Sequence, residues 1–287
     1  MIDPLDAVAR EVGSLARHHN PDCASWKAAR RAILNAAEFL RAEAGEDHPP
    51  INPRIIARLR GVQAIEFFGA DESPEALLIP TRGGFVIRLP TGRPQVRHRS
   101  SIAHEIGHTF FYDIRNGWPT RLLTRNSVGR LSHKEEDICR AFARALLVPA
   151  AQALEIKDTH PTAAGLELVS LLAKRFEVSE EFAAVRLMRD LDQLKYSVAI
   201  FQDRATSHAE RSSERRYIGR GLRSLRKSER EVLDSLTDVL SKASSEQRHF
   251  LIEHAHRHRK LAEFRWNVSE SATHCHTALL VDFPRQR

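Results

Sequence analysis

Two histidines four positions apart, His104 and His108, occur in the stretch SSIAHEIGHTF with Glu105 directly after the first. On a helix, residues with this spacing lie on one face about one turn apart, so both imidazoles can reach a single zinc ion. Glu105 would then lie beside the open coordination position, where a carboxylate can take a proton from metal-bound water and pass it to a leaving amine. Because a chain with 15 histidines can contain this motif by chance, a third ligand is needed to support the prediction.

The segment SHKEEDICRAFARALLVP provides candidates for this ligand on a second helix, expected from about residue 133 to 147. Ser132 and Glu135 fit a capping box at its start, which would give Glu135 a structural role at the helix end. Glu136 is then the freer carboxylate, and we predict that it is the third ligand. Two histidines and one glutamate leave a coordination position for water, which is the pattern of a catalytic rather than a structural zinc site.

Tyr112 follows His108 by one helical turn. Its hydroxyl could hydrogen-bond an oxyanion that develops during hydrolysis, or its ring could simply pack against apolar neighbours. Position in the sequence leaves both roles open.

Helices and a small sheet are expected to position these residues. Residues 1–45 carry apolar side chains at helical spacing up to a glycine, and IIARLRGV is typical of a further short helix. The runs QAIEFFG, EALLIP and GFVIRLP indicate strands of a small antiparallel sheet, with TRGG as a hairpin turn. RHRSSIAHEIGHTFFYDI then returns to helical spacing.

Helical spacing continues over residues 164–176 and 179–193, and the apolar run KYSVAIFQ opens a second unit. The segment SHAERSSERR is typical of an exposed loop. Two helices and a strand pair, FRWNVSE with TALLVDF, are expected to follow. The helices have capping-box starts at Ser228 with Glu231 and at Ser244 with Gln247.

The run from the strands through HEIGHTFFYD to AFARALLVP resembles the ImmA/IrrE metallopeptidases. In that family a glutamate ligand lies six positions before the phenylalanine of an F-A-x-x-L-L-x-P ending, and here Phe142 minus six is Glu136. The resemblance covers about residues 51–190. One departure is Arg140, which stands where many relatives have an asparagine that hydrogen-bonds near the site.

This resemblance implies an α+β protein with one zinc ion per chain that hydrolyses peptide bonds. A zincin-like metallopeptidase domain is expected over residues 1–193, including a helix-turn-helix-like connector at about 160–193. A sensor-like α+β domain would follow over residues 194–287. The implied substrate is a helix-turn-helix transcriptional repressor, whose cleavage would derepress genes of stress, DNA damage, mobile elements or phage defence.

Composition and charge limit the cellular location and the partners that we expect for this protein. No apolar run approaches the roughly eighteen residues needed to cross a bilayer, and the N-terminus lacks the features of a signal peptide. We therefore expect a cytoplasmic protein without a membrane partner. The formal net charge is +7, and residues 202–230 contain nine Lys or Arg against four acids.

The basic stretch could bind single-stranded nucleic acid as an activator, or it could be a solvated surface. The residues that would contact nucleic acid surround Tyr217 and are Arg211, Arg215, Arg216, Arg220 and Arg223. The segment LLAKRFEVSEEFAAVRL could read DNA by itself, but its apolar residues are also those that two packed helices need. These residues are Leu171, Leu172, Phe176, Val178, Ala184 and Leu187.

Three scattered cysteines, Cys23, Cys139 and Cys275, predict free thiols rather than a disulfide framework. A thiolate from Cys23 or Cys275 could cap the zinc ion in a latent state. The main alternative to an enzyme is a DNA-binding or partner-binding regulator in which zinc has no catalytic role.

Overall fold

The computed structural model describes residues 3–17, 22–69, 76–114, 117–123, 128–163, 165–193, 198–205, 213–219, 263–268 and 274–281. The chain divides into two compact units, of which unit 1 comprises Met1–Ile156 and Leu172–Ser179. Unit 2 comprises Lys157–Leu171 and Glu180–Arg287. The predicted connector is therefore divided between the units, and a boundary between independent domains near residue 193 stays a prediction.

Unit 1 begins with two packed helices, α1 (Pro4–Arg17) and α2 (Cys23–Ala44), as the apolar spacing predicts. Asp22 caps α2 by accepting a hydrogen bond from the backbone N–H of Ser25 at 2.8 Å. Gly45 ends this helix in the left-handed region, at φ +68°, where glycine carries no steric penalty. Helix α2 also packs against α5 (Val128–Leu147).

After α3 (Pro53–Leu59), a three-stranded sheet forms in the order β1 (Val62–Phe68), β3 (Gly84–Pro90), β2 (Leu77–Thr81). The hairpin of β2 and β3 is antiparallel, as predicted. Strand β1, however, pairs with β3 in parallel, so the sheet is mixed and the prediction of an antiparallel sheet is wrong for this pair. Apolar alternation did not reveal this difference, because side chains alternate between faces in both kinds of sheet.

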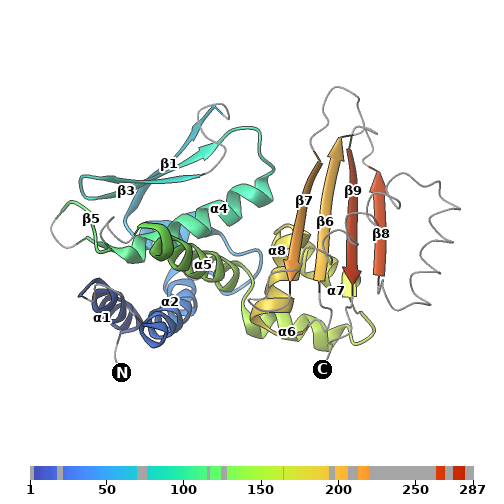
Figure 1. Cartoon of the computed structure of the whole chain (residues 1–287), viewed down its shortest axis with the longest axis horizontal. Helices are drawn as coiled ribbons and strands as arrows, with labels where there is room; N and C mark the ends of the chain where they lie inside the picture. The colour runs from blue at the N-terminus through green and yellow to red at the C-terminus, as the bar shows by residue number, and fades with distance from the viewer. Residues whose placement is uncertain are drawn as a thin grey trace, which may run out of the picture. The chain divides into compact units, whose positions relative to one another are not determined.

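The sheet is followed by α4 (Gln95–His108) and a 3₁₀ turn, Thr109–Phe111. A short hairpin of β4 (Tyr112–Asp113) and β5 (Thr120–Arg121) comes next, and then helix α5. Helices α4 and α5 pack together, and Figure 1 shows them beside the sheet of β1 and β3. The predicted helix at HEIGH is thus confirmed, although it ends at His108 and its last predicted residues form the turn and β4.

Helix α5 begins at Val128, so Ser132 lies inside it and cannot be its N-cap. The predicted capping box of Ser132 and Glu135 is therefore wrong. A Ser-x-x-Glu pattern marks a helix start only where the preceding residues do not continue the helix. Here the residues before Ser132 are themselves helical.

Four helical segments follow: α6 (Ala150–Thr159), α7 (Gly165–Phe176), α8 (Glu180–Val185) and a π-helical turn, Arg186–Asp190. Helices α7 and α8 were predicted from the sequence, whereas α6 was not. Five of the apolar residues expected to pack are at most 4% exposed, and Leu171 is half-buried. The five are Leu172, Phe176, Val178, Ala184 and Leu187. Their burial supports the packing interpretation of this segment over the DNA-reading one.

Unit 2 contains a four-stranded antiparallel sheet in the order β7, β6, β9, β8 (Figure 1). The strands are β6 (Val198–Ala205), β7 (Ser213–Gly219), β8 (Glu263–Val268) and β9 (His274–Val281). The strand at KYSVAIFQ and the pair formed by FRWNVSE and TALLVDF are therefore confirmed. Residues 213–216 lie in β7, so the end of the predicted loop SHAERSSERR is a strand.

Several predictions concern residues outside the described part of the chain. These are the capping boxes at Ser228 with Glu231 and Ser244 with Gln247, and the arginines Arg211, Arg220 and Arg223. Cys23 and Cys139 are free thiols, exposed and buried respectively. Of the helices in the described ranges, none has the length and apolar character to cross a membrane.

Candidate metal centre

Helix α4 brings the two predicted histidines together. The Nε2 atoms of His104 and His108 lie 3.1 Å apart, and the ring centroids are 4.8 Å apart. The side chains are 21% and 14% exposed, so the pair is largely shielded but reachable from solvent. This is the result expected for an i, i+4 pair on one helical face.

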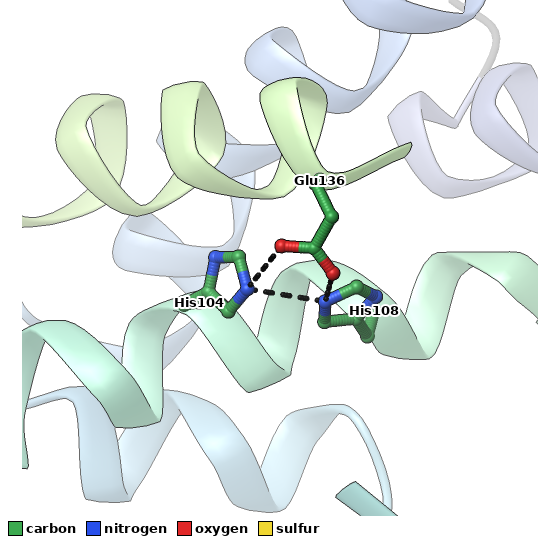
Figure 2. A group of neighbouring side chains, drawn as sticks. All are labelled: His104, His108 and Glu136. Atoms are coloured by element: carbon green, nitrogen blue, oxygen red, sulfur yellow. Dashed lines mark hydrogen bonds and ion pairs between the residues drawn. The ribbon is translucent and has the colours of Figure 1, made fainter. Parts of the chain in front are cut away.

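Glu136 reaches both imidazoles from α5 (Figure 2). Its Oε2 atom lies 3.2 Å from Nε2 of His104, and its Oε1 atom lies 3.2 Å from Nε2 of His108. The hydrogen bonds to the two histidines lower the pKa of Glu136 well below its usual range. The carboxylate is therefore ionised at neutral pH, as a metal ligand must be.

These three side chains fit a zinc ion in donor type and spacing. Ligand atoms at 2.0–2.2 Å from a tetrahedral zinc lie about 3.3–3.6 Å from one another, close to the separations found here. Within the described ranges, His104, His108 and Glu136 form the group of potential metal ligands, and Cys23 is not part of it. The donor set of two imidazoles and one carboxylate is that of catalytic zinc sites.

Gly107 allows α4 and α5 to approach closely enough for this convergence. A Cβ atom at this position would lie 3.0 Å from Cα and 3.1 Å from Cβ of Cys139 on α5. Because these are atoms of the helix framework, they cannot rotate out of the way. Glycine at the fourth position of HEIGH thus has a packing role that the motif does not reveal.

Arg60 anchors the end of α4 directly after His108. Its guanidinium donates to Oγ1 and to the backbone oxygen of Thr109, at 3.1 and 3.4 Å, and lies 4.3 Å from the ring centroid of Phe110. Burial lowers the pKa of Arg60 to about 10, so the side chain still carries its charge at neutral pH. A cation at a helix C-terminus is favourable because backbone carbonyls point towards it.

Glu135 does not cap a helix; it contacts the other side of His108. Its Oε1 atom accepts a hydrogen bond from Nδ1 of His108 at 2.8 Å, and Oε2 accepts one from Nη2 of Arg121 at 2.7 Å. The side chain is only 3% exposed. Sequence reasoning missed this role, and no sequence signal pointed to Arg121, which lies in the short strand β5 between α4 and α5.

Tyr112 lies at the start of β4 and is half-buried. Its hydroxyl oxygen accepts a hydrogen bond from Nη1 of Arg121 at 3.3 Å, and its ring packs edge-on against Phe85. Both anticipated behaviours, packing and a polar role of the hydroxyl, are compatible with this placement. The predicted base, Glu105, lies on α4 next to His104 and is 6% exposed.

The ionisation of the surrounding groups follows from burial and from these contacts. Burial lowers the pKa of His108, but contacts with Cys139, Glu135 and Glu136 raise it by more, so the net shift is upwards. Burial also raises the pKa of the Cys139 thiol to about 11. Cys139 is therefore a neutral thiol at physiological pH in the metal-free protein.

Arg140, where the family resemblance predicts an asparagine, contacts the carboxylate of Glu136. Its Nη2 atom lies 3.4 Å from Oε2 of Glu136, and its side chain is 60% exposed. The hydrogen bond next to Glu136 is thus supplied by a guanidinium. An exposed ion pair of this kind contributes little to stability.

A histidine pair on one helix, a carboxylate from a second helix and a small sheet in the same unit form an arrangement that could hold a metal ion, as zincin-like sites do. Residues 61–188 match the model of a peptidase family described as the IrrE N-terminal-like domain. This match confirms the resemblance to the ImmA/IrrE proteins over residues 61–188.

Comparison with solved structures finds a chain described as a Mycobacterium tuberculosis transcriptional regulator. The match covers 98% of this chain and 94% of that chain, at 12% identity and a TM-score of 0.43. No curated protein matches the chain.

Proposed function

We propose that this protein is a zinc-dependent endopeptidase. His104, His108 and Glu136 hold one zinc ion, and Glu105 is the general base. The observation that carries the proposal is the convergence of two imidazoles and one carboxylate, from two helices, at mutual distances of 3.1–3.2 Å. Membership of a peptidase family supports a hydrolytic rather than a purely structural role for this group.

A bound zinc ion would lower the pKa of a coordinated water and polarise the carbonyl of the scissile peptide bond. Glu105 accepts the proton from the attacking water and returns it to the amine of the leaving peptide. The hydroxyl of Tyr112, oriented by its hydrogen bond from Arg121, donates to the oxyanion of the tetrahedral intermediate.

The substrate that we propose is a helix-turn-helix transcriptional repressor. This proposal is supported by the family resemblance. Cleavage of the repressor would derepress genes of stress, DNA damage or defence against phages and mobile elements. We place the reaction in the cytoplasm, where such repressors work.

We further propose that the basic stretch at residues 202–230 binds single-stranded nucleic acid as an activator. Arg215 and Arg216 lie on β7, an edge strand of the described sheet of unit 2. Binding through phosphate contacts must weaken steeply as salt is added. Binding to a labelled single strand that does not change between 50 and 300 mM salt, about a sixfold range, would exclude this activator.

The function is tested by co-expressing the chain with candidate repressors encoded next to it. Wild type is compared with Glu105→Gln, and repressor size is followed on a gel. We expect cleavage by wild type only, while zinc content and fold stay equal in both proteins, because Glu105 is not a ligand. If neither protein cleaves the repressor although both bind zinc, the chain is instead a regulator with a non-catalytic zinc site.

A further inference from the structure

Behind His108 lies a pair of charged side chains that a three-ligand zinc site does not require. Glu135 accepts a hydrogen bond from Nδ1 of His108 with one carboxylate oxygen and one from Arg121 with the other. Both carboxylate oxygens therefore have a partner, and the side chain is almost fully buried. A buried carboxylate is tolerated when it is paired in this way, and the pairing also fixes its orientation.

The geometry separates Glu135 from the ligands themselves. Glu136 contacts Nε2 of both histidines, whereas Glu135 contacts Nδ1, on the other edge of the His108 ring. A carboxylate that accepts the Nδ1 proton leaves the lone pair on Nε2, where the metal binds. The same hydrogen bond fixes the orientation of the His108 ring and makes its Nε2 atom more basic.

Arg121 belongs to neither metal-binding helix. It lies at the end of β5, paired across the hairpin with Tyr112 on β4, and its Nη1 atom donates to the Tyr112 hydroxyl. A backbone hydrogen bond from Leu122 N to Phe111 O closes the base of the hairpin, and one from Gly83 N to Gly117 O joins its loop to the turn between β2 and β3. Glu135 and Arg121 thus connect the His108 ring to a third element, the β4–β5 hairpin.

We propose that Glu135 and Arg121 are positioning residues of the metal centre. Glu135 holds His108 in the tautomer and orientation that bind metal, and Arg121 holds Glu135. The affinity for metal therefore depends on the β4–β5 hairpin as well as on α4 and α5. This inference rests on the proposed zinc site.

The test measures the zinc dissociation constant of the full chain by competition with a chromophoric chelator at fixed pH. Glu135→Gln should weaken zinc binding by about 10- to 100-fold, and Arg121→Gln by about 10-fold. The double variant should bind about as weakly as Glu135→Gln alone, because Arg121 acts through Glu135. Glu135→Asp, which keeps the charge, should recover part of the affinity.

Asp137→Asn is the matched control, because it makes the same change of carboxylate to amide on the same helix at a side chain that is 67% exposed. Its zinc affinity should equal that of wild type. Thermal unfolding without metal establishes that each variant is folded, and the visible spectrum of the Co²⁺-loaded protein reports the geometry of the ligands around the metal. The spectrum should change in Glu135→Gln and stay unchanged in the control.

The outcomes distinguish this inference from the proposed function. Zinc binding by wild type with equal affinity in folded Glu135→Gln would overturn the positioning role and leave the metal site in place. If the fold-loss of zinc affinity in the double variant equals the product of the losses in the two single variants, Arg121 acts independently of Glu135. That result would contradict the proposed chain of contacts. Absence of zinc binding by wild type would overturn the metal site and the inference together.

Discussion

At the scale of single residues, two adjacent glutamates of α5 serve the same histidine in different ways. Glu136 lies against the Nε2 atoms of His104 and His108, while Glu135 accepts the Nδ1 proton of His108. Successive residues of a helix point about 100° apart, so the two carboxylates approach the imidazole from different sides.

Tyr112→Phe tests the role of the phenol. We expect kcat to fall about 100-fold with little change in KM, because an oxyanion donor acts in the transition state. Zinc affinity should stay at the wild-type value, since Arg121 keeps its hydrogen bond to Glu135 through Nη2. An unchanged kcat would instead assign Tyr112 to packing against Phe85.

At the scale of elements, the metal site depends on how closely α4 and α5 approach. Gly107 faces Cys139 across this contact, three residues after His104 and one before His108. The distance between the helices decides whether Glu136 reaches both imidazoles. Packing and ligand geometry are therefore set by the same pair of residues.

Gly107→Ala should lower the free energy of unfolding by about 1–3 kcal/mol, because the added methyl group overpacks the contact between the helices. It should also weaken zinc binding, since α5 must move away from α4. Denaturant unfolding of the metal-free protein and chelator competition measure the two effects.

Gly13→Ala on α1 is the matched control. Its added Cβ would lie 3.7 Å from the terminal Nη1 atom of Arg17, an ordinary contact. Alanine in a helix interior should raise the free energy of unfolding by roughly 0.5–1 kcal/mol and leave zinc affinity unchanged. Similar stability and zinc affinity in the two variants would contradict a special role for Gly107.

At the scale of the molecule, the metal centre joins segments that are far apart in the sequence. The histidines of α4, Arg121 of β5 and the two glutamates of α5 all belong to unit 1. Anything that binds this folded arrangement but not the unfolded chain stabilises unit 1 by mass action.

Removal of zinc with a chelator should therefore lower the stability of unit 1. At a zinc concentration 100 times the dissociation constant, bound zinc is expected to raise the free energy of unfolding by about 2.7 kcal/mol. Thermal unfolding with and without zinc measures it, and hydrogen exchange should show added protection in α4 and α5. Glu136→Gln should lose most of this gain, and a gain of equal size in that variant would place the zinc ion elsewhere.

The sequence by itself determined most of the helices, the strand runs, the hairpin at TRGG and the three candidate ligands. These features depend on local periodicity and on residue spacing within one helix, which are visible along the chain. The start of α5 was misplaced because the capping pattern recurs inside a helix. The parallel pairing of β1 was missed because alternation is the same in both kinds of sheet.

Only the tertiary structure decided which atoms of the metal centre meet. Glu136 contacts both imidazoles. Glu135, expected to be a helix cap, instead accepts a hydrogen bond from His108, and Arg121 of the hairpin donates to Glu135. The physical reason is that a hydrogen bond or a ligand bond is decided by tenths of an ångström between side chains of separate elements. Those distances follow from helix packing, here limited by Gly107, and local sequence patterns carry no information about them.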